Sequence, residues 1–205
     1  MNRTTHDAGP SRDAARTQKA LLRAARHRFA IDGYAETTVR SIAADAGVNV
    51  ALIGRYFGSK EGLFARCLAR EMPPLQTAGH GAASLDDLAD SMIDFLTTDT
   101  GADDLLQLLL LLRTSGDERA DAMRRDALAT FSREVAKAAG HDPDAPQRRG
   151  LLGAQTALGA VLGILMMRTS TPIQPLASAD RQILRSVLRA PLTSMLGAEE
   201  RPRHP

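Results

Sequence analysis

Six side chains that can make directed polar contacts lie within one short stretch of the sequence, between residues 37 and 60. They are Thr38, Arg40, Asn49, Arg55, Tyr56 and Lys60. Hydroxyl, guanidinium, amide and ammonium groups suit hydrogen bonding to phosphate oxygens and to base edges. Bond-breaking chemistry has no comparable support: the five His are scattered, Cys is single, and no nucleophile elbow, phosphate-binding loop or metal motif occurs. The sequence therefore predicts a binding protein without a cofactor or a metal, and not an enzyme.

The elements that position these groups are predicted to be helices throughout. Apolar residues make up 43% of the chain and aromatic residues only 3%, so the core must consist largely of Leu and Ala, which favour helices. A single Cys excludes an internal disulfide framework. The N-terminal residues lack the apolar stretch of a signal peptide, and the uncharged run Leu151–Met167 is shorter than the roughly 20 residues of a membrane span. We expect a cytoplasmic all-α protein in which that run is a buried helix.

Periodicity and capping residues predict about nine helices in two domains. Residues 1–11 and 198–205 are polar arms, residues 12–72 form an N-terminal helix-turn-helix domain, and residues 73–197 form a C-terminal helical domain. The expected helices span roughly 11–33, 39–46, 49–57, 59–72, 84–98, 102–114, 117–140, 147–168 and 178–197. Their expected N-caps include Thr38, Asn49, Ser59, Ser84, Asp117 and Ser178.

Residues 38–57 have the spacing of a helix-turn-helix, in which a turn containing Gly47 joins two short helices. Apolar residues such as Ala43 and Ile53 recur on the inner faces of the two helices. The start and outer face of the second helix carry Asn49, Val50, Ala51, Leu52, Arg55 and Tyr56. A helix presented in this way fits the major groove of DNA, and the three adjacent apolar side chains at its start fit thymine methyl groups.

The run from Phe29 to Phe64 resembles the DNA-binding domain of the tetracycline-repressor (TetR) family. The resemblance rests on Gly33-Tyr34, Thr37-Thr38, Ile42-Ala43, Ala46-Gly47-Val48, Tyr56-Phe57 and Ser59-Lys60-Glu61 at fixed spacing. Gly54 departs from the bulky residue usual in the family, which implies an altered contact with DNA. The resemblance implies a one-component regulator whose helical C-terminal domain pairs two protomers and usually holds a small-molecule pocket. Ligand binding then releases an inverted-repeat operator.

The resemblance also implies roles for individual residues. Lys60 and Tyr56 match phosphate-contact positions of the family, and Lys60 lies at a helix N-terminus, where the helix dipole favours an anion. Arg40 matches a position that can reach guanine, although phosphate contact is equally open. Arg55 either contacts phosphate or stays solvated. Thr38 caps its helix whether or not it also donates to a phosphate.

The charge distribution favours DNA binding by the N-terminal domain. Residues 12–72 carry 11 Lys and Arg against 6 Asp and Glu, whereas residues 73–205 carry 14 against 17. A basic head on a mildly acidic body is what phosphate binding by one end of a molecule needs. A solvated basic surface would have the same composition.

The C-terminal domain offers candidates for a ligand pocket and for a dimer interface. A pocket for a hydrophobic effector would be lined by Met92, Phe95, Leu96, Leu105, Leu108, Leu109, Leu112, Met123, Leu128 and Phe131. A four-helix dimer interface would be formed by Gly153, Ala157, Ala160, Leu184, Leu188 and Leu192. Intramolecular core packing is the competing interpretation for both sets.

We therefore expect a repressor that a small, mainly hydrophobic effector releases from a palindromic operator. Its partners would be double-stranded DNA, a second copy of the chain and the effector, with no membrane. One alternative is an effector-independent architectural or constitutive DNA-binding regulator. Another is a helical enzyme or lipid-binding protein with a borrowed N-terminal domain, although no acid–base pair lies at a recognisable spacing.

Overall fold

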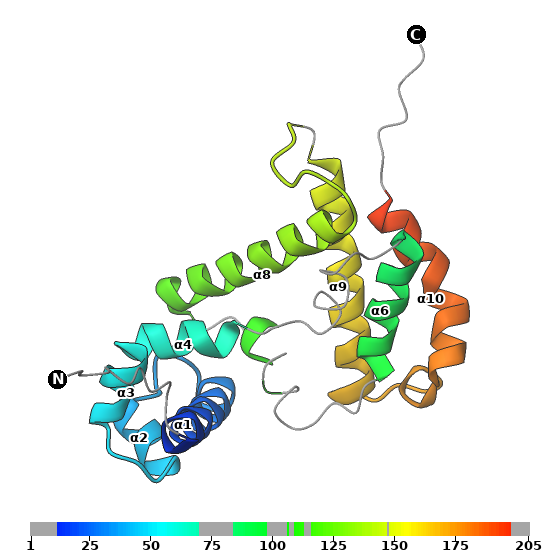
Figure 1. Cartoon of the computed structure of the whole chain (residues 1–205). Helices are drawn as coiled ribbons and strands as arrows, with labels where there is room; N and C mark the ends of the chain where they lie inside the picture. The colour runs from blue at the N-terminus through cyan, green and yellow to red at the C-terminus, as the bar shows by residue number, and fades with distance from the viewer. Residues whose placement is uncertain are drawn as a thin grey trace, which may run out of the picture.

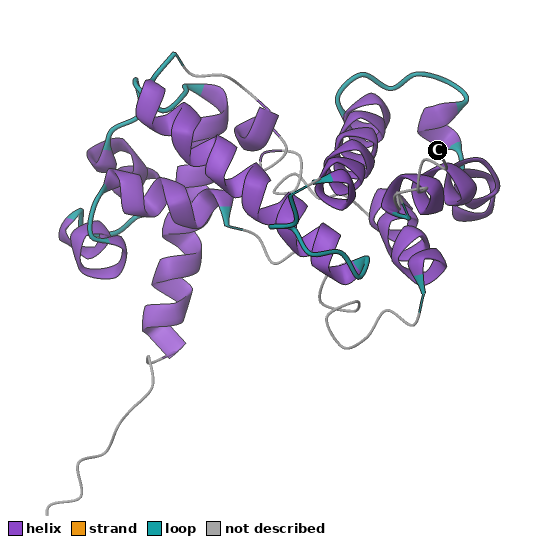
Figure 2. Ribbon diagram, turned by 90° about the horizontal axis from the view of Figure 1, so that it is seen from above, coloured by secondary structure: helices purple, strands orange, loops and turns teal. Residues whose placement is uncertain are grey.

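The structure is a computed structural model that describes residues 12–69, 84–97, 106, 109–112, 116–146 and 148–197. Every regular element in these residues is helical (Figures 1 and 2), and the predicted all-α fold is confirmed. The elements are α1 (Arg12–Ile31), α2 (Val39–Asp45), α3 (Ala51–Phe57), α4 (Lys60–Leu68), α6 (Leu85–Thr97), α8 (Glu118–Ala138), α9 (Arg149–Thr169), the 3-10 helix η1 (Leu176–Ser178) and α10 (Arg181–Leu196). Of the predicted helix 102–114, only residues 106 and 109–112 are described, and they are helical.

Helices α1 to α4 form an N-terminal unit, on the left of Figure 1. α1 packs on α2 and α4, and α3 packs on α4. Leu21 and Phe29 of α1 are fully buried, as are Ile42 of α2 and Phe64 of α4. Burying a large apolar side chain contributes roughly 1.5–3 kcal/mol. This shared core stabilises α2 and α3, which are too short to be stable helices by themselves.

Helices α6, α8, α9 and α10 form a C-terminal unit, on the right of Figure 1. α10 lies along α6 and α9, and α8 pairs with α9. α8 also contacts α4, and Figure 1 shows it running from the N-terminal unit to α9. The two units are thus joined by a packed contact between α4 and α8 in addition to the chain connection.

Most helices begin at the residue that the sequence predicts. Side-chain oxygens of Thr38, Ser59 and Asp117 accept hydrogen bonds from backbone amides of α2, α4 and α8. Ser84 accepts a hydrogen bond from the amide of Asp87 at the start of α6, with an N···O distance of 3.2 Å. These contacts satisfy amides that the first turn of a helix leaves unpaired.

Two predicted caps are wrong. α3 begins after Val50, which makes no side-chain cap bond. Asn49 lies one residue further out, where its Oδ1 accepts a hydrogen bond of 2.8 Å from the amide of Ala51. α10 is capped by Asp180, whereas Ser178 belongs to η1. Asp and Ser cap helices about equally well, so the sequence alone does not choose between neighbouring candidates.

α9 is a described helix that is long and apolar enough to cross a membrane by composition. Along one face it packs on α8, α10 and α6, and Val161 and Leu165 are almost fully enclosed there. The opposite face is exposed, with Leu152 showing 63% of its surface. The predicted buried helix is therefore buried along one side only.

Candidate nucleic-acid interface

The helix-turn-helix consists of α2, a turn and α3. Ala43 of α2 and Ile53 of α3 are buried, so the two helices share an apolar contact. In the turn, Gly47 has φ +66°, a left-handed conformation that favours glycine. The amide of Val48 donates a hydrogen bond of 3.0 Å to the carbonyl of Ala43. This geometry fixes the direction of α3 relative to α2.

Most of the residues predicted to contact DNA lie on the surface of this unit. Thr38, Arg40, Asn49, Val50, Ala51 and Arg55 are exposed, whereas Leu52, Tyr56 and Lys60 are half-buried. Leu52 packs against the core, so Val50 and Ala51 are the more accessible apolar groups. Among the described residues, none covers the exposed start of α3, as a role in the major groove requires.

The hydroxyl of Thr38 is engaged at the start of α2. It accepts a hydrogen bond of 3.0 Å from the amide of Ser41 and lies 3.2 Å from the Ser41 hydroxyl. Ser41 in turn accepts from the amide of Thr38 at 3.2 Å, which completes a capping box. The predicted capping role of Thr38 is confirmed, and a phosphate contact by the same hydroxyl stays a prediction.

Lys60 is held by its neighbours at the start of α4. Its Nζ lies 4.3 Å from the ring centroid of Tyr34 and donates a 3.4 Å hydrogen bond to the carbonyl of Ala35. Burial, and next the charge of Glu61, raise the pKa of Tyr34 to about 12. The face of the aromatic ring attracts the Lys60 cation through its quadrupole. The ammonium group is thereby kept near a helix start capped by Ser59, where the dipole favours an anion.

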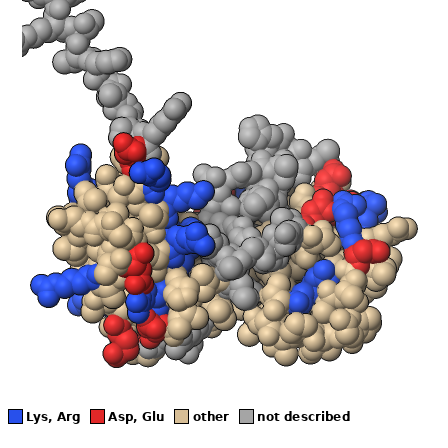
Figure 3. Space-filling model, turned by 90° about the horizontal axis from the view of Figure 1, so that it is seen from below, with Lys and Arg blue, Asp and Glu red and all other residues tan. Residues whose placement is uncertain are grey.

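Sequence reasoning missed that the basic charge of the N-terminal domain belongs to α1. This helix carries six Lys and Arg against one Asp, while the rest of residues 12–72 carries five of each sign. α3 has Arg55 alone. Figure 3 shows basic side chains spread over the N-terminal unit with acidic side chains among them, and basic and acidic side chains in contact on the C-terminal unit. Counting the charged residues along α1 at helical spacing, rather than over the whole domain, would have revealed that its basic side chains form a row.

An open hollow of about 570 Å³ lies between α1 and the end of α2. Its basic lining residues, hereafter the α1 basic row, are Arg16, Lys19, Arg23 and His27. Asp45 also borders the hollow, but Arg28 donates hydrogen bonds of 2.5 and 2.9 Å to its carboxylate. These bonds hold the pKa of Asp45 below its usual value, so the carboxylate stays ionised and paired. The hollow therefore has a net positive lining beside the turn that leads into α3.

The predicted ligand pocket is only partly in the described part of the chain. Met92, Leu96 and Phe131 are buried, and Phe95, Leu109, Met123 and Leu128 are half-buried. Leu112 is 41% exposed, and Leu105 and Leu108 lie outside the described residues. None of these residues lines the hollow on α1 or a second hollow on α10. The pocket stays a prediction.

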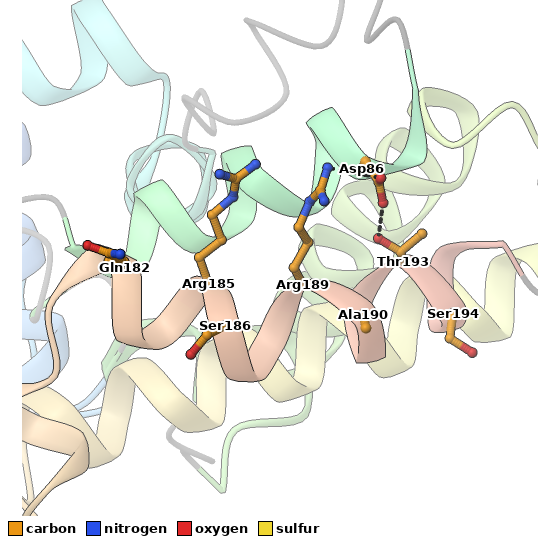
Figure 4. Close-up of a pocket in the computed structure, with 8 residues that line it drawn as sticks. All are labelled: Asp86, Gln182, Arg185, Ser186, Arg189, Ala190, Thr193 and Ser194. Carbon is orange, nitrogen blue, oxygen red and sulfur yellow. Dashed lines mark hydrogen bonds and ion pairs between the residues drawn. The ribbon is translucent and has the colours of Figure 1, made fainter.

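The second hollow, of about 800 Å³, is an open groove on α10 beside α6 (Figure 4). Arg185 points across it and donates hydrogen bonds of 2.8 and 2.7 Å to Asp90, whose pKa these bonds lower. Arg189 pairs with Asp86 at 2.9 Å, and Thr193 donates to the same carboxylate at 2.8 Å. The polar groups of this groove join α10 to α6, so we assign them a structural role.

Four of the six residues predicted for the dimer interface lie inside the protomer, and the prediction is wrong for them. The four are Gly153, Ala157, Leu184 and Leu192, whereas Ala160 and Leu188 are half-buried. The exposed large apolar residues of α9 and α10 are Leu152, Met166, Met167, Ile183 and Val187. α9 is apolar around most of its circumference, so helical periodicity did not reveal which face turns inward.

Two family profiles match most of the chain. Residues 21–67 match the family described as "Bacterial regulatory proteins, tetR family". Residues 86–196 match "Tetracyclin repressor-like, C-terminal domain". No curated protein matches the chain.

Solved structures share the fold over nearly the whole chain. A TetR-family regulator from Streptomyces coelicolor A3 is 26% identical, with a TM-score of 0.54 over 92% of this chain and 99% of that one. NalD of Pseudomonas aeruginosa, the secondary repressor of the MexAB-OprM multidrug efflux pump, is 23% identical, with a TM-score of 0.62 over 85% and 95%. The fatty acid degradation regulator FadR from Bacillus halodurans is 18% identical, with a TM-score of 0.56 over 89% and 99%. Because the profile matches extend over both helical units, this chain belongs to the tetR family of bacterial regulatory proteins.

Proposed function

We propose that this protein is a repressor that binds an inverted-repeat DNA operator as a homodimer and is released by a small, mainly hydrophobic ligand. Its family consists of DNA-binding regulators controlled by small molecules. The observation that carries the proposal is the open start of α3, where Asn49, Val50 and Ala51 are exposed on a helix anchored from behind by Ile53. A helix held in this way can enter the major groove without rearrangement.

The proposed contacts divide into base readout and phosphate binding. The start of α3 and Arg40 read base edges, and Tyr56 and Lys60 bind phosphates. Arg55 is assigned to phosphate, because it is an exposed cation on the same helix. The α1 basic row binds phosphates of the flanking DNA, since its hollow adjoins the end of α2 and supplies charge that α3 lacks.

The DNA proposal is tested by selecting bound duplexes from a random library and measuring their affinity by mobility shift. Lys60→Ala is expected to weaken binding to every duplex and to reduce the slope of log affinity against log salt by about 0.9. Arg40→Ala is expected to relax preference at one base pair. A selection that enriches no sequence would overturn the operator, and equal effects of both variants on all duplexes would overturn the role of Arg40.

We assign dimerisation to the exposed apolar residues of α9 and α10, which include Leu152, Ile183 and Val187. Val187→Glu places a charge where an apolar contact is proposed, so sedimentation should show monomers and a two-half-site duplex should bind more weakly. Ile31→Glu makes the same change at an exposed position of α1 and serves as the control for oligomeric state. Dimers of unchanged stability in Val187→Glu would contradict the assignment.

A second candidate function is regulation without an effector, because neither described hollow is lined by the predicted pocket residues. A thermal-shift screen with aliphatic and aromatic compounds separates the two. A compound that raises the unfolding midpoint and releases DNA supports the effector proposal. Absence of such a compound from a broad screen favours constitutive binding. Regulators of this family are generally not enzymes and are normally cytoplasmic. We propose that this chain is likewise cytoplasmic, has no enzymatic activity and has no membrane partner.

A further inference from the structure

Arg124 of α8 is the charged residue that the fold buries most deeply in the described part of the chain, with 5% of its surface exposed. Burial of a guanidinium group is unfavourable unless hydrogen bonds and an opposite charge compensate for the lost water. The partners of Arg124 therefore indicate what this side chain joins.

The Arg124 guanidinium contacts two other helical elements and one residue of its own helix. Its Nε donates a 2.6 Å hydrogen bond to the carbonyl of Leu110, in the helical residues 109–112. Its Nη1 donates a 2.6 Å hydrogen bond to Asp121, one turn earlier in α8. Its central carbon lies 5.1 Å from the ring centroid of Phe64, in α4. One planar group thus links the 109–112 segment of the C-terminal unit to the last helix of the N-terminal unit.

From Phe64 the contacts continue to a residue proposed to bind DNA. The ring centroid of Phe64 lies 4.9 Å from that of Tyr34. The ring of Tyr34 is in turn the one that attracts the Lys60 ammonium, whose nitrogen lies 4.3 Å from the ring centroid. Two packed aromatic rings therefore separate the Arg124 guanidinium from the Lys60 ammonium.

We propose that Arg124 is a positioning residue that couples the 109–112 segment to α4 and thereby sets the position of Lys60 for DNA. The DNA part of this inference rests on the proposed function. Leu109 and Leu112, in the same segment, are two of the residues predicted for the effector pocket. A shift of this segment moves the carbonyl that holds Arg124, and α4 then loses a contact that fixes its place against α8.

The chain contains its own reporter for the separation of α4 from α1, because the Cys67 thiol lies 3.9 Å from the carbonyl of Leu22 in α1. Cys67 is the only cysteine, it is fully buried in α4, and burial raises its pKa to about 12. Its thiol therefore reacts with Ellman's reagent only when α4 opens locally. Arg124→Met keeps a long side chain with an apolar stem but removes the hydrogen bonds and the charge. We expect the Cys67 rate to rise about tenfold or more, and the salt slope for a random-sequence duplex to fall by about 0.9.

Val135→Ala provides the matched control, because Val135 is buried on the same helix. It should lower the unfolding midpoint while leaving the Cys67 rate and the salt slope unchanged. The two variants are compared under conditions in which each lies equally far below its unfolding midpoint. If Cys67 then reacts at the same rate in both, Arg124 is only structural and the inference is overturned. Arg124→Lys, which keeps a charge and one donor, should give an intermediate rate and replaces Arg124→Met if the latter does not fold.

A double-mutant cycle tests whether the coupling passes through Arg124. Leu110 is fully buried, so Leu110→Ala perturbs the 109–112 segment. It should raise the Cys67 rate when Arg124 is present and have little further effect in the Arg124→Met background. Equal effects in both backgrounds would overturn the route through Arg124. The thiol assay needs no DNA, so a chain that binds no duplex would sink the proposed function while leaving this coupling measurable.

Discussion

α1 and α10 both carry rows of basic residues at helical spacing, but the fold treats the two rows differently. On α10, Arg181, Arg185 and Arg189 each form an ion pair with an aspartate of α6. On α1, Asp13 approaches Arg16 at 3.9 Å between two largely exposed side chains, and Arg28, which is outside the α1 basic row, pairs with Asp32 and Asp45.

The difference lies in what packs beside each row. α6 presents four aspartates and lies directly along α10, so the two helices nearly neutralise each other. α1 packs on α2 and α4, which carry one acidic residue each, and the one in α2, Asp45, pairs with Arg28 outside the α1 basic row. A basic row therefore indicates an anion-binding surface only where no acidic helix is packed against it.

The largest effect is expected when the α1 basic row is neutralised. The triple variant Arg16→Gln, Lys19→Gln and Arg23→Gln should weaken binding to any duplex about a hundredfold at low salt. Its salt slope should fall by up to about 2.7, since each lost phosphate contact removes about 0.9. Mobility shifts at several salt concentrations measure both quantities.

The matched control makes the same charge change on α10, as Arg181→Gln, Arg185→Gln and Arg189→Gln. It should lower the free energy of unfolding, since three ion pairs to α6 are lost, and leave the salt slope of any DNA-binding dimer unchanged. Equal losses of DNA affinity in the two triple variants would mean that total charge, and not the α1 basic row, governs binding.

A smaller effect is expected from Asp90→Asn in the paired row. Arg185 hydrogen bonds lower the pKa of Asp90 below its usual value of 3.8. The stabilisation from this carboxylate is therefore present above that value and is lost as the pH falls through the lower pKa of the folded state. We expect the variant to be less stable by about 1 kcal/mol at neutral pH. The free energies of unfolding of wild type and variant should become equal in acid.

Urea unfolding across the pH range measures this difference. Asp126→Asn, which removes an exposed carboxylate of α8, is the control and should show little change at any pH. A constant gap between wild type and Asp90→Asn down to the most acidic buffers would contradict the role of the ion pair.

The smallest effect concerns α3, the helix that the α1 basic row is proposed to supplement. A Cβ at Gly54 would meet no atom within 4 Å, so Gly54→Ala should fit without strain. Glycine inside a helix costs up to about 1 kcal/mol relative to alanine, and the variant should be more stable by roughly 0.5–1 kcal/mol in urea unfolding. A loss of DNA affinity in this more stable variant would show that DNA approaches the helix closely at Gly54.

Much of the fold was predictable because its determinants are local. Thr38, Ser59 and Asp117 begin helices in the structure as their sequence context indicates. The exposed start of α3 also followed from the sequence, because Asn49, Val50 and Ala51 precede Ile53, the apolar residue predicted to face inward. The α1 basic row was predictable in principle, because its spacing is visible along one helix.

The contacts between distant helices were not predictable. The sequence pattern predicts a dimer interface at Gly153, Ala157, Leu184 and Leu192, and the structure buries all four in the protomer. An apolar helix such as α9 offers several faces of nearly equal hydrophobicity, and the neighbouring helices decide which one is covered. Arg124 had no distinguishing signal either, because an arginine beside an aspartate on a helix is usually a solvated surface pair.

The helices, the helix-turn-helix and the family are encoded locally, because capping, turn glycines and short-range periodicity act within a few residues. Which charges are neutralised, and which side chain joins the two units, depends on how the helices pack in the folded chain. Arg181 and Asp94 are 87 residues apart in the chain, and Arg124 meets Phe64 only where α8 crosses α4. Such long-range pairings depend on the packing of whole helices, and no local pattern encodes them.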